Sequence, residues 1–308
     1  MTTSSTPGKI ILFGEHAVVY GRPALAVPVT QVHANVDVSD SSRAGIWIDA
    51  PDVHLHAELN TLPSDHPIAS VIHNFLFLSR VSPFPNLEIR ITSTIPVASG
   101  LGSGAAVTVA LTRALAAQLN YSMADEEVNA FTYEIEKLHH GTPSGIDNTV
   151  VTYAKPVYFV KGQSMEIFKV GQPFTIVIAD TGIPAPTKES VGDVRRLWMN
   201  DKSHLETVFD KIGEISFTAR RAIEAGKPEM LGELMNENHA LLQKLTVSSP
   251  ELDQLVGAAR NAGALGAKLS GGGRGGNLIA LVQPEISESI SSSLKEAGAK
   301  NTIITQVL

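Results

Sequence analysis

Residues 95–106 read Ile95-Pro96-Val97-Ala98-Ser99-Gly100-Leu101-Gly102-Ser103-Gly104-Ala105-Ala106, and this glycine-rich turn separates two different periodicities. Before it, apolar residues alternate with polar ones from Leu87 to Thr92, which is typical of a half-buried strand. After it, residues 105–119 contain no Gly or Pro and place apolar side chains at three- and four-residue intervals, as a helix does. The turn therefore ends at a helix N-terminus, where unpaired amides and the helix dipole favour an anion such as phosphate.

This turn alone does not identify a function. It matches neither the Gly-x-Gly-x-x-Gly dinucleotide fingerprint nor the Gly-x-x-x-x-Gly-Lys-Ser/Thr phosphate loop. A tight strand-to-helix turn that binds nothing would use the same residue types. Other segments of the chain must decide between these interpretations.

Composition excludes several classes of protein. The 308 residues suit two domains, and 43% of them are hydrophobic, which is ordinary for a globular protein. A formal net charge of −7 argues against a nucleic-acid partner, which needs a basic face. The lack of cysteine excludes disulfides and thiolate catalysis. No apolar run is as long as a membrane span and residues 1–7 lack a signal-peptide pattern, so we expect a cytoplasmic protein with no membrane partner.

Hydrophobic periodicity predicts an α+β protein of two domains, residues 1–170 and 171–308. The order of elements in the second domain favours an antiparallel sheet with helices on one face. Strands are predicted at about 9–13, 32–38, 46–48, 87–92, 157–160, 174–179, 264–269, 277–282 and 302–308. Helices are predicted at about 67–78, 105–119, 122–140, 203–225, 228–245, 250–261 and 285–297. Only residues 1–6 are expected to be disordered.

Ionisable residues gather around the first predicted strand. Lys9 stands at its start, and Glu15 and His16 lie in the glycine-bounded turn that follows. Taken singly, they could be a surface lysine, an exposed glutamate and a core histidine with a backbone partner. Together in one short segment they favour a polar pocket at the edge of the sheet.

Two carboxylates mark a further segment at residues 136–148. Glu136 borders the buried face of a predicted helix, and Asp147 follows a rigid Pro-Ser-Gly turn. Such carboxylates can hold a divalent cation and accept a proton at different places in one cleft. The alternatives are a solvated helix carboxylate for Glu136 and a helix N-cap for Asp147.

Glycine dominates the segment between two predicted strands near the C-terminus. Five of the six residues 271–276 are glycine and the sixth is Arg274, while Lys268 lies just before them. The glycines indicate a backbone that passes close to a bound nucleotide or substrate, with Arg274 or Lys268 available to an anion. A flexible hinge is the alternative.

In this order, the segments resemble the motifs of the GHMP kinases, and the resemblance spans nearly the whole chain. The run Pro-Gly-Lys-x-x-Leu-x-Gly-Glu-His-Ala-Val-Val-Tyr-Gly at 7–21 and the run His-Gly-x-Pro-Ser-Gly-x-Asp-Asn at 140–148 are most similar to members that act on mevalonate. Galactokinases have arginine in place of Lys9. The resemblance implies a two-domain GHMP kinase fold, with an N-terminal mixed sheet and a C-terminal ferredoxin-like sheet. It also implies ATP as phosphoryl donor, Mg²⁺ as cofactor, and direct in-line transfer to the C5 hydroxyl of (R)-mevalonate.

The resemblance also implies roles for individual residues. Asp147 would be the base that takes the proton from the substrate hydroxyl, Lys9 would stabilise this carboxylate and the transferring phosphoryl, and Glu136 would bind magnesium. The loop expected to wrap the ATP phosphates comprises Pro96, Ala98, Ser99, Gly100, Leu101, Gly102, Ser103, Gly104 and Ala105. The residues expected to contact mevalonate are Lys9, Glu15, His16, Val19, Asp147, Thr187 and Gly272. Thr187 matches a threonine near the transferred phosphate. These roles agree with the general needs of phosphoryl transfer, which are alignment and charge neutralisation.

Two residues depart from the family pattern. Gly104 stands where many members have a serine that binds magnesium, so Ser103 or a water is expected to take that ligand position. Arg274 stands where the family has glycine, and it would either contact phosphate or point to solvent. The alternative functions are a GHMP kinase for another small alcohol (phosphomevalonate, another position of mevalonate, or a sugar) and a catalytically silent nucleotide-binding sensor. Because dimers are common in the family, a homodimer is also expected.

Overall fold

The computed structural model describes residues 1–96, 99–140, 143–185 and 187–308, without the side chains of residues 140 and 188. The chain has an α+β fold and divides into two compact units. Unit 1 comprises Met1–Gly8, Val32–Pro96 and Gly102–Ala154, and unit 2 comprises Lys9–Gln31, Val97–Leu101 and Lys155–Leu308. The domain boundary at residue 170 stays a prediction.

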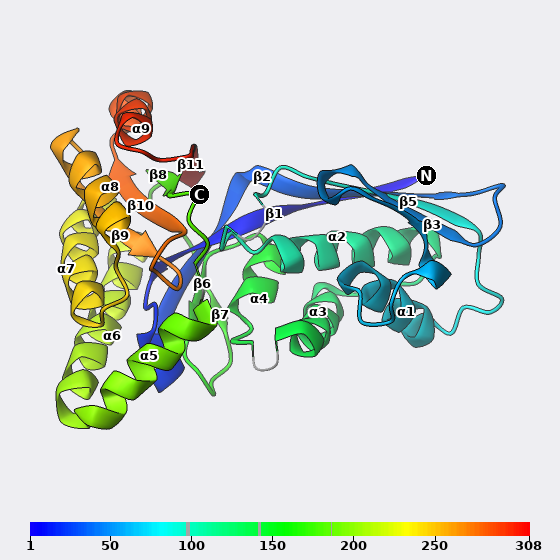
Figure 1. Cartoon of the computed structure of the whole chain (residues 1–308), viewed down its shortest axis with the longest axis horizontal. Helices are drawn as coiled ribbons and strands as arrows, with labels where there is room; N and C mark the ends of the chain where they lie inside the picture. The colour runs from blue at the N-terminus through cyan, green and yellow to red at the C-terminus, as the bar shows by residue number, and fades with distance from the viewer. Residues whose placement is uncertain (97–98, 141–142, 186) are drawn as a thin grey trace. The chain divides into compact units, whose positions relative to one another are not determined.

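A mixed sheet begins the fold, as expected (Figure 1). Its strands are β1 (Thr2–Phe13), β2 (Ala24–Asp40), β3 (Ile46–Ala50), β4 (Leu55–Glu58), β5 (Leu87–Ser93), β6 (Val157–Phe159) and β7 (Glu166–Ile167). They are ordered β4-β3-β5-β2-β6-β7, and β1 pairs with β2. Strand β5 pairs antiparallel to β2 but parallel to β3, which makes the sheet mixed. The long strands β1 and β2 contribute residues to both units.

Four α-helices of the described residues belong to unit 1, and the first three follow the predicted apolar patterns closely. They are α1 (Pro67–Ser79), α2 (Ser103–Gln118), α3 (Asp125–His140) and α4 (Ile146–Tyr153). In Figure 1, α1, α2 and α3 lie on one side of β2, β3 and β5. The alternate residues Ile89 and Ile91 of β5 are buried with Leu111 and Leu115 of α2 in one apolar core. Each such buried side chain contributes about 1.5–3 kcal/mol to folding, so this core holds the second half of α2 against the sheet.

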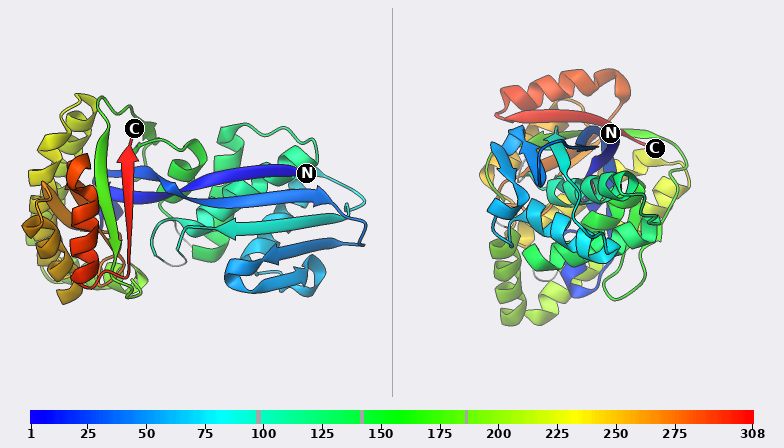
Figure 2. Two further views of the ribbon diagram at one scale, coloured as in Figure 1. Left: turned by 90° about the horizontal axis from the view of Figure 1, so that it is seen from above. Right: turned by 90° about the vertical axis from the view of Figure 1, so that its right-hand side faces the viewer.

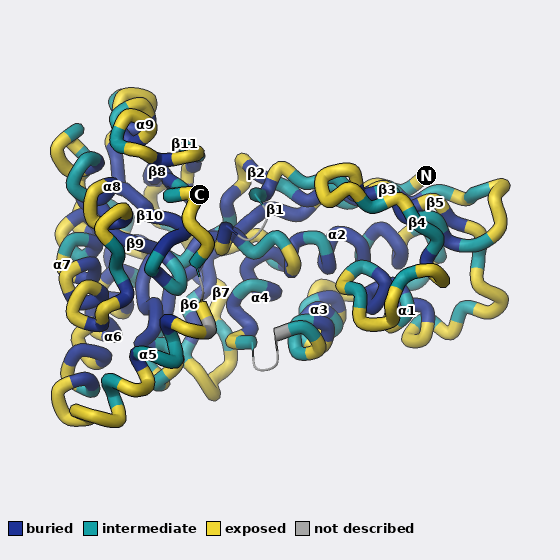
Figure 3. Tube along the Cα trace, in the orientation of Figure 1, coloured by how far each residue is buried: buried dark blue, intermediate teal, exposed yellow. Residues whose placement is uncertain are grey.

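Unit 2 contains the predicted antiparallel sheet, in the order β11-β8-β10-β9. Its strands are β8 (Phe174–Asp180), β9 (Gly266–Ser270), β10 (Asn277–Val282) and β11 (Asn301–Val307). Its helices are α5 (Thr187–Asn200), α6 (Lys202–Glu224), α7 (Leu231–Lys244), α8 (Pro250–Asn261) and α9 (Ser287–Glu296). Helices α8 and α9 pack on one face of this sheet, as Figure 2 shows. Every residue of β9 and β10 is buried, which Figure 3 shows as dark blue.

Helix α7 covers β9, the edge strand of this sheet. The Asn236 side-chain oxygen accepts a hydrogen bond from the Ala267 amide (3.1 Å), and His239 Nδ1 accepts one from the Leu269 amide (3.3 Å). A spacing of three residues on the helix therefore matches a spacing of two on the strand. His239 is neutral in this arrangement, because burial lowers its pKa to about 4.

The structure overturns one prediction and adds elements that periodicity missed. Residues 1–6 are not disordered, since β1 begins at Thr2 and Thr6 is fully buried. The Thr2 hydroxyl lies 3.2 Å from the Ala114 carbonyl oxygen of α2. Small polar side chains resemble a flexible tail in composition, but here they alternate along a paired strand. Helices α4 and α5 were also not predicted. Among the described residues, no helix is both long enough and apolar enough to cross a membrane.

Candidate functional site

The start of α2 has the features of an anion site. Gly102 precedes the helix with φ +73°, a conformation that glycine adopts without strain, and its carbonyl accepts the Ala106 amide at 2.9 Å. Because Gly102 has no side chain, it cannot cap the amides of Ser103, Gly104 and Ala105. The first turn also carries no acidic residue. These amides and the helix dipole therefore favour a negative ligand here.

Two carboxylates of unit 1 are placed by α3 and α4. Glu136 is half-buried on α3, and a Cβ atom added to Gly104 would lie 3.8 Å from its Oε1. The residue that departs from the family pattern therefore stands beside the carboxylate expected to bind magnesium. Asp147 is half-buried in the first turn of α4, whose N-cap is Gly145. The alternative role of Asp147 as the N-cap is therefore wrong.

In unit 2, the turn after β1 is shaped by Gly14. Its φ is +95°, and an added Cβ would lie 2.4 Å from the Ala24 Cα and from the Pro23 oxygen. Only glycine fits, and the chain consequently turns Glu15 and His16 into the interior, where both are buried. His16 itself has φ +61°, an uncommon conformation for a residue with a side chain.

Glu15 forms a buried ion pair with Lys268 of β9. The side chain of Lys268 is fully buried and that of Glu15 is 1% exposed. Lys268 Nζ donates to Glu15 Oε1 and also to the Leu269 carbonyl (2.6 Å). Burial raises the pKa of Glu15 and lowers that of Lys268, while each charge opposes the shift of the other. Glu15 is therefore not an exposed glutamate, and Lys268 is paired inside the protein.

His16 presents an acceptor to whatever lies next to it. Its Nε2 lies 3.1 Å from the Gly272 carbonyl oxygen and must donate the proton there. Burial lowers the pKa of His16 to about 4, the Gly272 bond opposes this shift, and the charge of Arg274 adds to it. The ring is therefore neutral, with an unprotonated Nδ1. Among the described groups, this Nδ1 and Oε2 of Glu15 are buried and have no hydrogen-bond partner, which suits a ligand that brings hydroxyl groups.

Close packing requires three of the glycines in 271–276, which are Gly272, Gly273 and Gly275. A Cβ on Gly272 would lie 2.7 Å from Thr187 Oγ1, and one on Gly273 would lie 1.9 Å from the Val247 oxygen. The predicted site residues Thr187 and Gly272 are thus brought together. These contacts favour a fixed backbone over a flexible hinge.

Two further contacts hold residues of the predicted phosphate loop within unit 2. The Lys9 amide donates to the Leu101 carbonyl at 2.9 Å, and Lys9 is buried. The Asn277 side chain donates to the Ser99 carbonyl. Asn277 was not among the predicted site residues, although its position directly after the glycine run was an available signal.

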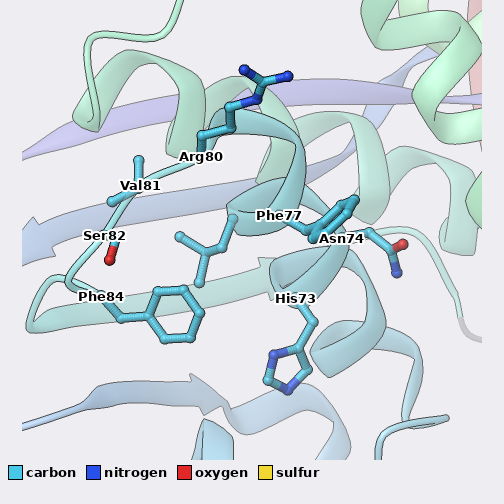
Figure 4. A pocket seen from close by; sticks show the side chains of 8 residues that line it. His73, Asn74, Phe77, Arg80, Val81, Ser82 and Phe84 are labelled. Atoms are coloured by element: carbon cyan, nitrogen blue, oxygen red, sulfur yellow. The ribbon is translucent and has the colours of Figure 1, made fainter.

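A pocket on α1 is not the candidate site. Its lining comes from α1 and the segment that follows it, as Figure 4 shows: His73, Asn74, Leu76, Phe77, Arg80, Val81, Ser82 and Phe84. None of the predicted site residues is among them.

Comparisons with known proteins now identify the family. The family descriptions "GHMP kinases N terminal domain" and "GHMP kinases C terminal" match residues 68–155 and 219–300. A mevalonate kinase of Pyrococcus abyssi is 35% identical to the chain, covering 100% of it and 96% of the relative. The chain belongs to the mevalonate kinase family of GHMP kinases. It is also 34% identical to a mevalonate kinase of Methanothermobacter thermautotrophicus, covering 91% of this chain and 89% of that one. The solved L. major mevalonate kinase in complex with R-mevalonate has a TM-score of 0.88 and 30% identity, covering 100% of this chain and 96% of that one.

Membership confirms the predicted fold and makes the protein a kinase, for which ATP is the phosphoryl donor. The roles of individual residues stay predictions. Ala98 lies outside the described residues, and Val19 is exposed on the short 3-10 helix Ala17–Tyr20.

Proposed function

We propose that the protein transfers the γ-phosphoryl group of ATP to the C5 hydroxyl of (R)-mevalonate, a step of isoprenoid biosynthesis by the mevalonate pathway. The observation that carries this proposal is the full-length likeness to mevalonate kinases, one of them solved with R-mevalonate. The buried acceptors at Glu15 and His16 add support, because mevalonate carries hydroxyl groups that could donate to them.

In the proposed reaction, the C5 hydroxyl oxygen of mevalonate attacks the γ-phosphorus of ATP. Asp147 accepts the proton that this hydroxyl loses. The bond to the bridging oxygen of ATP breaks, ADP leaves and 5-phosphomevalonate forms. Lys9 stabilises the charge on the transferring phosphoryl, and the amides at the start of α2 hold the ATP phosphates. Thr187 and Gly272 contribute to positioning the alcohol.

Magnesium fits the residues of unit 1. Proteins hold Mg²⁺ with one or two carboxylates, waters and substrate phosphates rather than with a full cage of side chains. The described residues accordingly contain no group of three or more His, Cys, Asp or Glu side chains that could hold a metal. Glu136 would bind the ion, with Ser103 or a water beside Gly104 completing its ligands. When bound, the ion would neutralise charge on the ATP phosphates.

Charge pairing in unit 2 argues against a phosphorylated substrate such as phosphomevalonate. A second phosphate would need additional cations, and among the described side chains the two cations that the sequence places at the glycine run are engaged. Lys268 is paired with Glu15, and Arg274 is paired with Asp193. The net charge of −7 likewise argues against a nucleic-acid partner. A cytoplasmic location and a homodimer complete the proposal, and light scattering of the purified protein would test the dimer.

A substrate panel tests the proposal directly. The purified protein is incubated with magnesium, ATP and mevalonate, phosphomevalonate, galactose or homoserine, and ADP release is followed. Turnover with mevalonate alone, with the new phosphate on C5 by phosphorus NMR, is expected. Turnover with another alcohol would reassign the substrate. ATP binding without turnover on any of them would favour the nucleotide sensor instead.

One variant tests the base. Asp147→Asn should remove turnover and leave ATP binding within about twofold, because only the proton acceptor is lost. Asp125→Asn is the matched control, since Asp125 also lies in the first turn of a helix and has no assigned role. Intact turnover in Asp147→Asn would refute the assignment.

A further inference from the structure

Arg274 is the one side chain in the glycine run 271–276, and it adopts a glycine conformation. Its φ is +59°, in the left-handed region that strains residues with a Cβ atom. Glycine would remove this strain at no cost in contacts if the side chain did nothing. The contacts of the side chain therefore decide what Arg274 does.

The guanidinium of Arg274 joins three parts of unit 2. Nη1 donates to the Asp193 carboxylate on α5. Nε and Nη2 both lie 3.4 Å from the Thr246 carbonyl oxygen. Thr246 follows the last turn of α7, where carbonyl groups carry the negative end of the helix dipole and favour a cation. The main-chain amide of Arg274 adds a bond of 2.8 Å to the Val247 carbonyl.

These contacts of Arg274 hold the 271–276 loop, which lies against two proposed substrate residues, His16 and Thr187. Gly272, two residues before Arg274, receives the His16 hydrogen bond at 3.1 Å and lies against Thr187 at the start of α5. Asp193 is on the same helix as Thr187, nearly two turns further on. Arg274 thus connects both sides of the contact between the loop and α5. Its charge also reaches His16, whose pKa it helps to lower.

We propose that Arg274 is a positioning residue that clamps the 271–276 loop to α5 and to the end of α7, and so fixes Gly272 against His16 and Thr187 for binding of the alcohol substrate. This inference rests on the proposed function. It differs from the two possibilities raised by the sequence, because the guanidinium contacts Asp193 and Thr246, while the side chain stays 30% exposed.

The kinetic test uses Arg274→Gly, which removes the side chain and the strain together. We expect the KM for mevalonate to rise about tenfold, with kcat and the KM for ATP changing less than twofold, because ground-state positioning is lost while the catalytic groups stay. Asp193→Asn should act similarly, and the double variant should be no worse than the poorer single variant. Arg274→Lys should recover part of the loss, since it keeps the positive charge but lacks the planar guanidinium that donates to both Asp193 and Thr246.

Arg196→Ala provides the matched control. Arg196 pairs with the same Asp193 carboxylate from the next turn of α5, and its side chain is 72% exposed. Its loss should change the KM for mevalonate less than twofold.

Hydrogen exchange of the substrate-free protein gives an independent measurement. The Thr181 amide donates to the Gly276 carbonyl at 2.9 Å, and the Gly276 amide donates to the Ile183 carbonyl at 2.8 Å. In Arg274→Gly, both amides should exchange at least tenfold faster. Faster exchange with a raised KM supports the proposal, whereas an unchanged exchange rate or an unchanged KM overturns it. If the wild-type protein turns over no mevalonate, the proposed function fails instead, and the exchange rates still show whether Arg274 clamps the loop.

Discussion

Replacing Lys268 with methionine should destabilise unit 2 by about 3–5 kcal/mol, because the change leaves the Glu15 carboxylate charged and without its cation in the interior. Lys268 is fully buried and the Glu15 side chain is 1% exposed, so water cannot replace the lost partner. Oε2 of Glu15 already has no partner among the described groups, and the change would strip Oε1 of its Lys268 donor as well. Methionine is close to lysine in length, so a cavity contributes little.

The double variant Glu15→Gln/Lys268→Met should recover most of this loss. A buried ion pair contributes little net stability, since desolvation offsets the attraction, whereas one unpaired charge is costly. Arg196→Met is the control in the same unit: it removes an exposed partner of Asp193 and should cost about 1 kcal/mol or less.

Urea unfolding followed by tryptophan fluorescence measures these differences. The chain has two tryptophans, Trp47 in unit 1 and Trp198 in unit 2, so a Trp47→Phe background makes the signal specific to unit 2. The deficit of Lys268→Met should shrink as the pH is lowered, because burial raises the pKa of Glu15 and its protonation removes the stranded charge. A deficit below about 1 kcal/mol, or one that Glu15→Gln does not relieve, would refute the reasoning.

Three further predictions concern pH, metal and packing. Lowering the pH from 6.5 toward 4 should lower the Tm, because burial lowers the pKa of His239 to about 4 in the fold. The folded protein then keeps this ring neutral, while the same ring in the unfolded chain takes up a proton near pH 6.5, and a constant Tm would contradict this. Gly104→Ser should lower the magnesium concentration that half-maximal ATP binding needs about 3–10-fold in calorimetry, since the added hydroxyl would lie beside Glu136 and offer a ligand. An unchanged magnesium requirement would count against the placement of the metal. Gly273→Ala should lower the Tm far more than Gly162→Ala in calorimetry. Both glycines have positive φ, but only the Cβ at residue 273 would meet a main-chain oxygen, at 1.9 Å. Equal losses of Tm would show that the backbone strain alone sets the cost.

Local patterns predicted the regular elements well. The alternation before the glycine turn and the helical spacing after it correspond to β5 and α2. These predictions succeed because one face of each element is buried in one core. Helix α5 does carry apolar residues at helical spacing, Val191, Val194, Leu197 and Trp198, but the polar composition of its 14 residues and the presence of Gly192 masked this stripe.

The partners of the site residues could not be predicted in the same way. Glu15 and Lys268 are 253 residues apart, and nothing in either segment specifies the other. The glycine at 273 indicates a close approach but does not say that the neighbour is Val247 rather than a ligand. The sequence thus predicted which residues have unusual environments, whereas the fold was needed to show which groups contact them.

The division of the chain between the two units has a consequence for its synthesis on the ribosome. Residues 9–31 are translated early, yet they belong to the unit that is otherwise built mainly from residues 155–308. At 5–20 residues per second, roughly 14–55 s pass between translation of Gln31 and Leu308. For most of that time the turn with Glu15 and His16 lacks its partners from β9 and the glycine run, because Lys268 and Gly272 are translated near the end of the chain. A fragment of residues 155–308 expressed alone would lack the strand and turn that fill its interior, so supplying residues 1–31 as a separate peptide should assist its folding.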